Sequence, residues 1–427
     1  MPTRIFLFVL VLLALIYPWQ PAGSYPIDGY QNTGMDRLKR LQDMDSAQLV
    51  RTLPYGARHP LEYIRLNLMD DPILDLPATD DQLQQELESM LPIFHPSYSL
   101  AVFDMTPGSE RYAERNPERG YQPGSVGKLA VVTALFCELE NLFIDDLDAR
   151  RKILQERVVK AGPFGVYDHH TIPRYDVETS RYTRGIVNER DEFSLYEWID
   201  HMLSVSNNGA ASIVWREAIL MRVFGKEYPN LTHEQMMDYF KTTPYEEKRD
   251  IAEDVINGPL RDMGIEHEEW RLGTMFTRGA SGIVPPKGGS IGTTRGLMKW
   301  LVALESGRVI DPYSSLEIKR LMYMTDRRIR YAHAPALDSA AVYFKSGSLY
   351  GCIPGTSCGK YRGNRMNYMN SVCIVEQPDG KRYMVVLMSN VLSRNSAYDH
   401  QVLATRIDKV IRGTERKDPS ESYGTGE

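Results

Sequence analysis

Apolar residues recur at two different spacings along the chain, and these spacings predict where strands and helices lie. Short apolar runs of the strand type occupy five stretches: residues 99–104, 111–113, 341–344, 371–377 and 382–389. The first two runs are joined by Thr-Pro-Gly and the last two by Pro-Asp-Gly, which are turn sequences typical of hairpins. We therefore predict an antiparallel sheet built from both halves of the chain.

Helical spacing of the apolar residues dominates elsewhere. The predicted helices span residues 80–91, 128–136, 146–161, 195–204, 210–224, 233–240, 243–257, 293–304 and 397–411. Because most of them fall between the early and the late strands, we predict an α+β fold: an antiparallel β-sheet flanked by helices, with an inserted all-α lobe. Residues 96–136 and 290–412 are expected to form the α/β lobe of a single domain, and residues 137–289 its all-α lobe.

The two ends of the chain have a different character. A basic residue precedes a continuous apolar run over residues 5–17, and a proline and small residues follow, which is the layout of a signal peptide over residues 1–24. The run is short for a membrane span, so we expect a secreted or periplasmic protein without stable membrane insertion; an uncleaved anchor is the alternative. Residues 25–95 are expected to form an N-terminal extension and residues 413–427 a polar tail.

Composition narrows the class of partner. The chain is 42% hydrophobic and 25% charged, with a formal net charge of −6 and no block of Lys and Arg. This balance argues against nucleic acid and anionic membranes as main partners. We also expect a monomer without a cofactor. The cysteines suit an oxidising compartment, and we favour a disulfide between Cys352 and Cys358 in a Gly/Pro-rich loop.

A polar pair opens the most apolar predicted helix. A Pro-Gly turn is followed by Ser125, and Lys128 lies one turn further on, before the apolar run of residues 129–136. The amine of Lys128 can then reach the Ser125 hydroxyl, and the N–H groups of the helix start favour negative charge there, which activates a serine nucleophile. The alternative is that Ser125 only caps the helix. Ser357 and Lys360 repeat the spacing, without an apolar helix behind them.

Two further polar clusters lie far from Ser125 in the sequence. Residues 206–208, Ser-Asn-Asn, connect two predicted helices, where a hydroxyl and two amides can face a cleft or merely cap the second helix. Residues 345–348, Lys-Ser-Gly-Ser, follow an apolar strand that we expect to lie inside the sheet, where the glycine lets a ligand approach the backbone. A lysine that protects an edge strand is the alternative explanation.

The three clusters together resemble a known family. Ser-x-x-Lys at a helix start, Ser-x-Asn in a helical insertion and Lys-Ser-Gly on a later strand occur in this order in class A β-lactamases and penicillin-binding proteins. Residues 120–129, the Thr-Thr-Arg-Gly-Leu stretch at 293–297 and both hairpins are also similar. The resemblance covers residues 99–411. It implies a serine hydrolase that attacks the amide of a β-lactam or of a peptidoglycan stem peptide through an acyl-enzyme.

The resemblance also implies a role for each polar residue. Catalytic roles fall on Ser125, Lys128, Ser206 and Lys345, and substrate-binding roles on Asn208, Ser346, Gly347 and Ser348. Ser125 would attack the carbonyl, Lys128 would take its proton, and Ser206 would protonate the leaving nitrogen. Lys345 and the two serines after it would bind the substrate carboxylate, and Asn208 would orient Lys128. Backbone N–H groups of Ser125 and Ser348 would form the oxyanion hole.

Two parts of the family pattern are missing. Class A β-lactamases carry a Glu that activates the deacylating water, but the corresponding segment here, residues 270–278, contains no acid. The glutamates of residues 266–269 could substitute if the loop is remodelled; otherwise they form a solvated acidic turn. Asn370 stands where many class A enzymes have a basic residue, and Arg328 or Arg330 is the candidate replacement.

Three functions therefore stay open. The first is a β-lactamase-like hydrolase with a relocated water-activating group, the second a D,D-carboxypeptidase or penicillin-binding protein that deacylates slowly, and the third a non-catalytic binder that keeps the cleft. An α/β-hydrolase is disfavoured because Pro123 replaces the first Gly of Gly-x-Ser-x-Gly. We predict no metal site, because the nine histidines contain one adjacent pair and no His-x-x-x-His.

Overall fold

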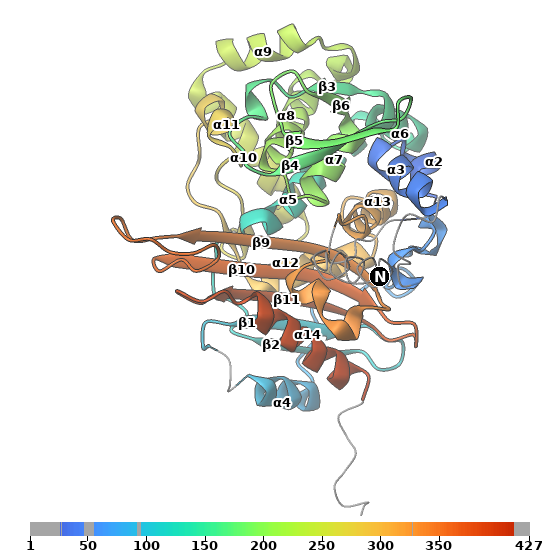
Figure 1. Cartoon of the computed structure of the whole chain (residues 1–427), viewed down its shortest axis with the longest axis vertical. Helices are drawn as coiled ribbons and strands as arrows, with labels where there is room; N and C mark the ends of the chain where they lie inside the picture. The colour runs from blue at the N-terminus through green and yellow to red at the C-terminus, as the bar shows by residue number, and fades with distance from the viewer. Residues whose placement is uncertain (1–25, 27, 47–54, 92–94, 327, 414–427) are drawn as a thin grey trace, which may run out of the picture.

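The computed structural model in Figure 1 shows a sheet with helices on both faces and a helical lobe above it. The structure describes residues 26, 28–46, 55–91, 95–326 and 328–413. The expected signal peptide, and the polar tail after its first residue, lie outside the described residues. None of the described helices is long and apolar enough to cross a membrane.

The central sheet is antiparallel throughout. Its strands are β1 (Ser99–Asp104), β2 (Arg111–Arg115), β9 (Ala341–Gly351), β10 (Met366–Glu376) and β11 (Arg382–Asn390), in the order β2-β1-β11-β10-β9. The register places Val102 opposite Val385 and Val372 opposite Lys345. Gly108 and Gly380, both at positive φ, lie in the turns of the two predicted hairpins. The predicted strands and hairpins are confirmed.

The position of β9 corrects one prediction. We expected the strand with Lys345 to lie inside the sheet, but β9 is an edge strand. Its first residues are buried because helix α13 (Pro312–Tyr323) and the short turn η1 (Tyr55–Ala57) pack over this edge. A run of buried residues therefore looks the same in a covered edge strand as in an interior one.

Alternate residues of the central strand β11 pack into two separate cores. Met384, Val386 and Met388 join the core shared with α5 (Lys128–Leu142) and α12 (Thr294–Glu305). The residues between them, such as Val385 and Leu387, join the core under α4 (Asp81–Met90) and α14 (Ala397–Ile411). Side chains of a strand point to opposite faces in turn, so a strand with both faces covered is apolar along its whole length.

The inserted lobe is mainly helical, as predicted. Its helices are α6 (Leu147–Glu156), α7 (Leu195–Leu203), α8 (Asn208–Phe224), α9 (His233–Thr242), α10 (Tyr245–Asp262) and α11 (Arg278–Ile283). Of these, α7, α8 and α10 pack against α5. The lobe also contains two small antiparallel sheets, formed by β3 (Val158–Lys160) with β6 (Glu192–Ser194) and by β4 (Thr171–Asp176) with β5 (Arg181–Ile186). Between the lobes, β7 (Trp270–Arg271) pairs with β8 (Ile291–Gly292). The fold class predicted from the sequence is confirmed.

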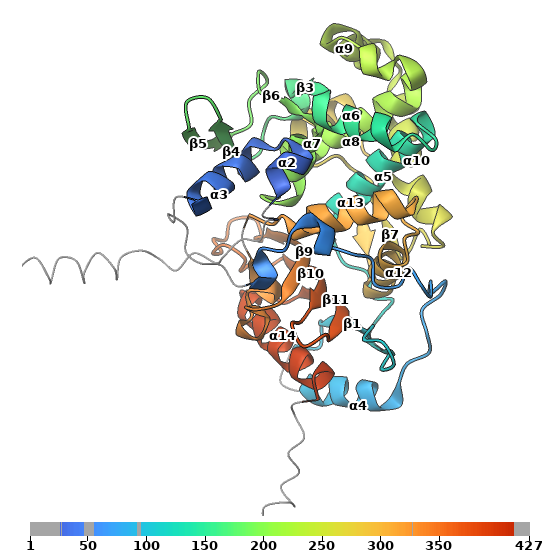
Figure 2. The same ribbon diagram turned by 90° about the vertical axis from the view of Figure 1, so that its right-hand side faces the viewer.

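The described part of the N-terminal extension packs on the rest of the chain. Helices α2 (Gly29–Thr33) and α3 (Asp36–Ser46) lie beside α7 and the β4–β5 hairpin (Figure 2). Arg37 pairs with Asp200 of α7, and the Asn67 amide donates hydrogen bonds to Glu305 and Glu376. These residues therefore dock on both the helical lobe and the sheet.

Candidate active site

Three elements meet where the sheet faces the helical lobe. Ser125 lies in the 3-10 turn η3 (Gly124–Gly127), which continues directly into α5, and β9 packs against this turn. Gly347 makes the close approach possible, because a Cβ built on it would lie 2.2 Å from the Pro123 carbonyl oxygen and 3.0 Å from the Ser125 nitrogen. Any side chain at Gly347 would push β9 away from the serine.

Lys128 contacts Ser125 and the predicted Ser-Asn-Asn segment. Its Nζ lies 3.2 Å from Ser125 Oγ and 3.4 Å from Ser206 Oγ, and it donates hydrogen bonds to the Ser206 carbonyl oxygen at 2.6 Å and to Asn208 Oδ1 at 2.8 Å. Burial lowers the pKa of Lys128 to about 7, although the charge of Asp168 raises it in part. An amine with this pKa is substantially neutral at physiological pH.

The Ser206 hydroxyl lies between two amines. Lys345 on β9 donates to Ser206 Oγ at 2.8 Å, and Lys128 Nζ lies 3.4 Å from the same oxygen. Burial, together with the charges of Lys128 and Arg330, holds the pKa of Lys345 well below its ordinary value. Ser206 itself has a φ of 62°, a left-handed backbone conformation that is unusual for serine and places this hydroxyl in the connection between α7 and α8.

The two asparagines after Ser206 have different functions. Asn207 is the cap of α8, since its Oδ1 accepts a hydrogen bond from the Ala210 N–H at 2.7 Å. The capping alternative therefore holds for Asn207, while Asn208 contacts Lys128. Asn208 in turn donates to Asp168, a buried acid that the sequence reasoning missed.

An arginine lies beside the last two residues of the Lys-Ser-Gly-Ser segment. Arg330 donates to the Gly347 carbonyl oxygen at 2.8 Å and to Ser348 Oγ at 2.9 Å, and its φ of 52° is again left-handed. Arg328, the other candidate, donates to carbonyl oxygens of residues 337 and 340 instead. Of the two candidates, Arg330 is therefore the one that lies at the site. Ser346 is buried in β9 between Lys345 and Gly347.

The segment that lacks the expected Glu presents apolar side chains to the site. The Phe276 ring centroid lies 5.3 Å from Lys128 Nζ, and the Leu272 side chain packs against Gly127. The upstream glutamates do not replace the missing acid: Glu269 pairs with Lys299 at 2.8 Å, and its two neighbours Glu266 and Glu268 are exposed. They form the solvated acidic turn.

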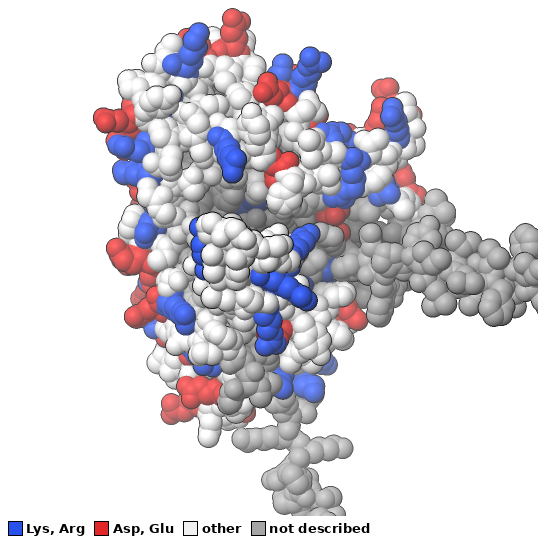
Figure 3. Space-filling view, turned by 60° about the vertical axis from the view of Figure 1, so that its left-hand side comes forward, with Lys and Arg blue, Asp and Glu red and all other residues white. Residues whose placement is uncertain are grey.

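The connection between β9 and β10 lies beside the site, since its Tyr361 ring centroid is 5.2 Å from the Arg330 guanidinium carbon. The predicted disulfide between Cys352 and Cys358 closes this connection. Residues 349–365 contain Lys360, Arg362 and Arg365 but no acid. Figure 3 shows this face hollowed between the two lobes, with Lys and Arg side chains along the rim.

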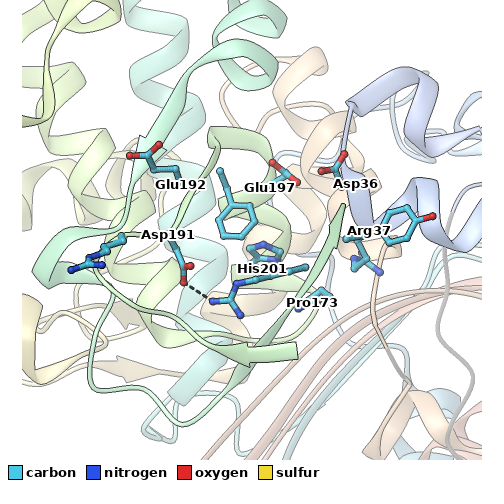
Figure 4. Close-up of a pocket in the computed structure, with 11 residues that line it drawn as sticks. Asp36, Arg37, Pro173, Asp191, Glu192, Glu197 and His201 are labelled. Carbon is cyan, nitrogen blue, oxygen red and sulfur yellow. Dashed lines mark hydrogen bonds and ion pairs between the residues drawn. The ribbon is translucent and has the colours of Figure 1, made fainter. Parts of the chain in front are cut away.

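A cavity of about 260 Å³ lies between α3 and α7, away from the predicted site residues (Figure 4). Asp36, Glu197 and His201 are among its lining residues, and none of the described lining residues belongs to the predicted site.

Elsewhere, the ligand-type atoms of Asp168, His169 and His170 lie within 4.8 Å of one another. Both Asp168 oxygens already accept hydrogen bonds, from Asn208 and His170, so we assign no metal to this group.

Comparisons with known proteins give the fold and the family of the chain. A family model described as the beta-lactamase enzyme family matches residues 82–410. Similar solved structures include a PBP-A mutant in an acyl-enzyme complex with penicillin G, at 14% identity and a TM-score of 0.50, covering 80% of this chain and 99% of that one. A class A beta-lactamase representative from Bacteroides cellulosilyticus has the same identity and TM-score, with 80% and 100% covered. A TLA-1 extended-spectrum beta-lactamase variant matches at 14% identity and 0.51, with 79% and 99% covered.

At such low identity these structures show a shared fold. No curated protein gives a significant match to the sequence. The family model, however, spans well over half of the 427 residues. The chain therefore belongs to the beta-lactamase enzyme family.

Proposed function

We propose that the protein is an exported serine hydrolase that opens β-lactam amides by forming an acyl-enzyme on Ser125. The observation that carries the proposal is the placement of Lys128 Nζ, 3.2 Å from Ser125 Oγ and in contact with Ser206 and Asn208. Export rests on the signal-peptide layout of residues 1–24.

Lys128 acts as the base for Ser125. A neutral amine has two N–H groups and one lone pair. The Ser206 carbonyl oxygen and Asn208 Oδ1 accept the two N–H groups, which leaves the lone pair for the Ser125 hydroxyl. Ser125 Oγ then bonds to the amide carbon as its proton moves to Lys128, and the N–H groups of Ser125 and Ser348 stabilise the oxyanion.

Ser206 completes the proton transfer. Its hydroxyl proton passes to the leaving nitrogen as the amide C–N bond breaks, and the Lys128 ammonium returns a proton to Ser206 Oγ across 3.4 Å. Lys345, 2.8 Å from the same oxygen, supports the transient negative charge. The net result is an ester on Ser125, a neutral leaving amine that has gained the one proton lost by Ser125, and a neutral Lys128.

The substrate carboxylate is proposed to bind between Lys345 and Ser348. Arg330 donates to Ser348 Oγ and adds a second positive charge close to Lys345. Burial, with repulsion from Lys128 and Arg330, lowers the pKa of Lys345, and a carboxylate placed there raises this pKa and favours the charged amine.

A second candidate is a D,D-carboxypeptidase or penicillin-binding protein, for which one observation speaks directly. Phe276 and Leu272 occupy the segment from which a class A β-lactamase presents its water-activating Glu. An ester shielded by apolar groups, without an adjacent carboxylate, hydrolyses slowly. The third candidate is a non-catalytic binder. Binding alone would not require that Lys128 and Lys345 both contact the Ser206 hydroxyl.

One experiment separates the three. Purified protein is incubated with benzylpenicillin and followed by intact mass, and in parallel with a chromogenic cephalosporin. Sustained turnover supports the β-lactamase, a stoichiometric adduct the peptidase, and neither signal the binder. Ser125→Ala should abolish any adduct, whereas Ser357→Ala, which alters the second Ser-x-x-Lys pair, should leave it intact. An adduct that survives Ser125→Ala contradicts the proposal.

A further inference from the structure

A buried carboxylate lies directly behind Asn208, on the side away from Lys128. Asp168 comes from the loop before β4, and its side chain is 1% exposed. Its Oδ2 accepts the backbone N–H of Asn208 at 2.5 Å, and its Oδ1 accepts the side-chain amide Nδ2 at 3.1 Å. One carboxylate therefore binds both N–H donors of the same residue.

This double contact fixes which end of the Asn208 amide faces the lysine. With Nδ2 turned to Asp168, Oδ1 points to Lys128 Nζ at 2.8 Å. A reversed amide would place an NH2 group against the amine and lose both hydrogen bonds. The orientation that Lys128 needs is thus set by a residue that does not touch Ser125.

Asp168 is also held ionised. The ring Nδ1 of His170 lies 2.8 Å from Asp168 Oδ1, and the backbone N–H of His169 donates to the same oxygen at 2.8 Å. Burial alone would raise the pKa of Asp168, but the contacts with His170 and Asn208 and the charge of Lys128 hold it well below its usual value.

We propose that Asp168 is a positioning residue for acylation, which orients the Asn208 amide and balances the charge that Lys128 gains when it takes the Ser125 proton. The inference rests on the proposed function for its kinetic part only. Lys345 and His170 also interact electrostatically with Lys128, but among the described groups Asp168 is the acid that raises the pKa of this lysine. Loss of Asp168 therefore removes the negative charge that favours the Lys128 ammonium.

The test compares Asp168→Asn with Asp191→Asn. Asp191 is a largely buried carboxylate of the same lobe that pairs with Arg174, away from Ser125, so its variant controls for loss of a buried acid. In Asp168→Asn, acylation by benzylpenicillin should be about 10- to 100-fold slower at its high-pH plateau, since hydrogen bonds to a charged group are lost. The pH at half-maximal rate should also fall, because the neutral form of Lys128 is favoured.

A second measurement is independent of acylation. The Lys128 side chain is titrated by NMR in protein labelled at the lysine ε-carbon, with Lys128→Met to assign the signal. The pKa of Lys128 should fall in Asp168→Asn and stay unchanged in Asp191→Asn. If wild type shows no adduct but this shift occurs, the proposed function fails and the position of Asp168 stands. An unchanged Lys128 titration in a folded Asp168→Asn variant overturns the inference.

Discussion

The Arg37 guanidinium and the Asp200 carboxylate form a two-pronged ion pair that joins the N-terminal extension to α7. Arg37 Nε and Nη2 donate to the two carboxylate oxygens at 2.8 and 2.6 Å, and the side chains are only 6% and 2% exposed. The next residue, His201, accepts the Asn207 N–H through its carbonyl oxygen at 3.0 Å. The ion pair thus stabilises the C-terminal end of α7, which leads into the connection that contains Ser206.

We predict that Arg37→Ala lowers the free energy of unfolding by about 3–5 kcal/mol, because Asp200 is left buried without its partner. Adding Asp200→Ala to the Arg37→Ala variant should recover part of the lost free energy of unfolding, because the unpaired buried carboxylate is then removed as well. Urea unfolding of both single variants and the double variant measures this coupling. Arg151→Ala, at an exposed pair with Asp148, is the matched control and should change stability by less than about 1 kcal/mol. Equal effects at both arginines would contradict the argument.

The rate of acylation should rise with pH. Lys128 must be neutral to accept the Ser125 proton, and burial lowers its pKa to about 7. Below that pKa the neutral fraction, and with it the acylation rate, should fall about tenfold per pH unit; above it the rate should level off. Intact-mass time courses with benzylpenicillin between about pH 5 and pH 9 measure the profile. A rate that is flat or that falls across this range would exclude Lys128 as the base.

Most residues of the site could be predicted from short sequence motifs. Ser125 and Lys128 share one helix start, so their contact follows from helical geometry alone. The contacts of Ser206 with Lys128 and with Lys345 could only be anticipated through a family resemblance, because no local rule brings residues that are distant in the chain together. The apolar periodicity likewise predicted the five strands of the sheet, but could not place β9 at its edge.

Other features had no signal that sequence reasoning could use. Asp168 lies 40 residues before Asn208 in a loop without periodicity, and only tertiary packing brings its carboxylate under that amide. Its place beside the one adjacent histidine pair was a hint, considered only as a metal site. Strand β5 is exposed along nearly all its length, so no apolar alternation marked it. Arg330 and Arg328 are two residues apart, and burial of both made the choice a matter of three-dimensional structure.

Arg330 should determine how much the substrate carboxylate contributes to the rate of acylation. Arg330→Gln should slow acylation by benzylpenicillin about 10- to 100-fold more than it slows acylation by the methyl ester of benzylpenicillin, which has no free carboxylate. The reason is that a charge-assisted contact near Ser348 is lost. Arg330→Lys keeps the charge at the same left-handed backbone position and should recover part of the rate. Lys360 is an exposed cation that contacts the Tyr361 ring, as Arg330 does, so Lys360→Ala is the control and should change the acylation rate little. The idea fails if acid and ester respond equally to Arg330→Gln.

The apolar contact of Phe276 with Lys128 should be what makes the acyl-enzyme long-lived. In Phe276→Glu a carboxylate comes close to the Ser125 ester and can activate water, so the penicillin adduct should decay about 100-fold faster than in wild type. The new acid should also raise the pKa of Lys128 and move the acylation profile to higher pH. Phe276→Gln, which has nearly the same shape without the charge, separates these effects from simple loss of the ring. Pulse-labelling followed by intact mass measures the lifetimes, and equal decay in the two variants would show that water is excluded by something other than this side chain.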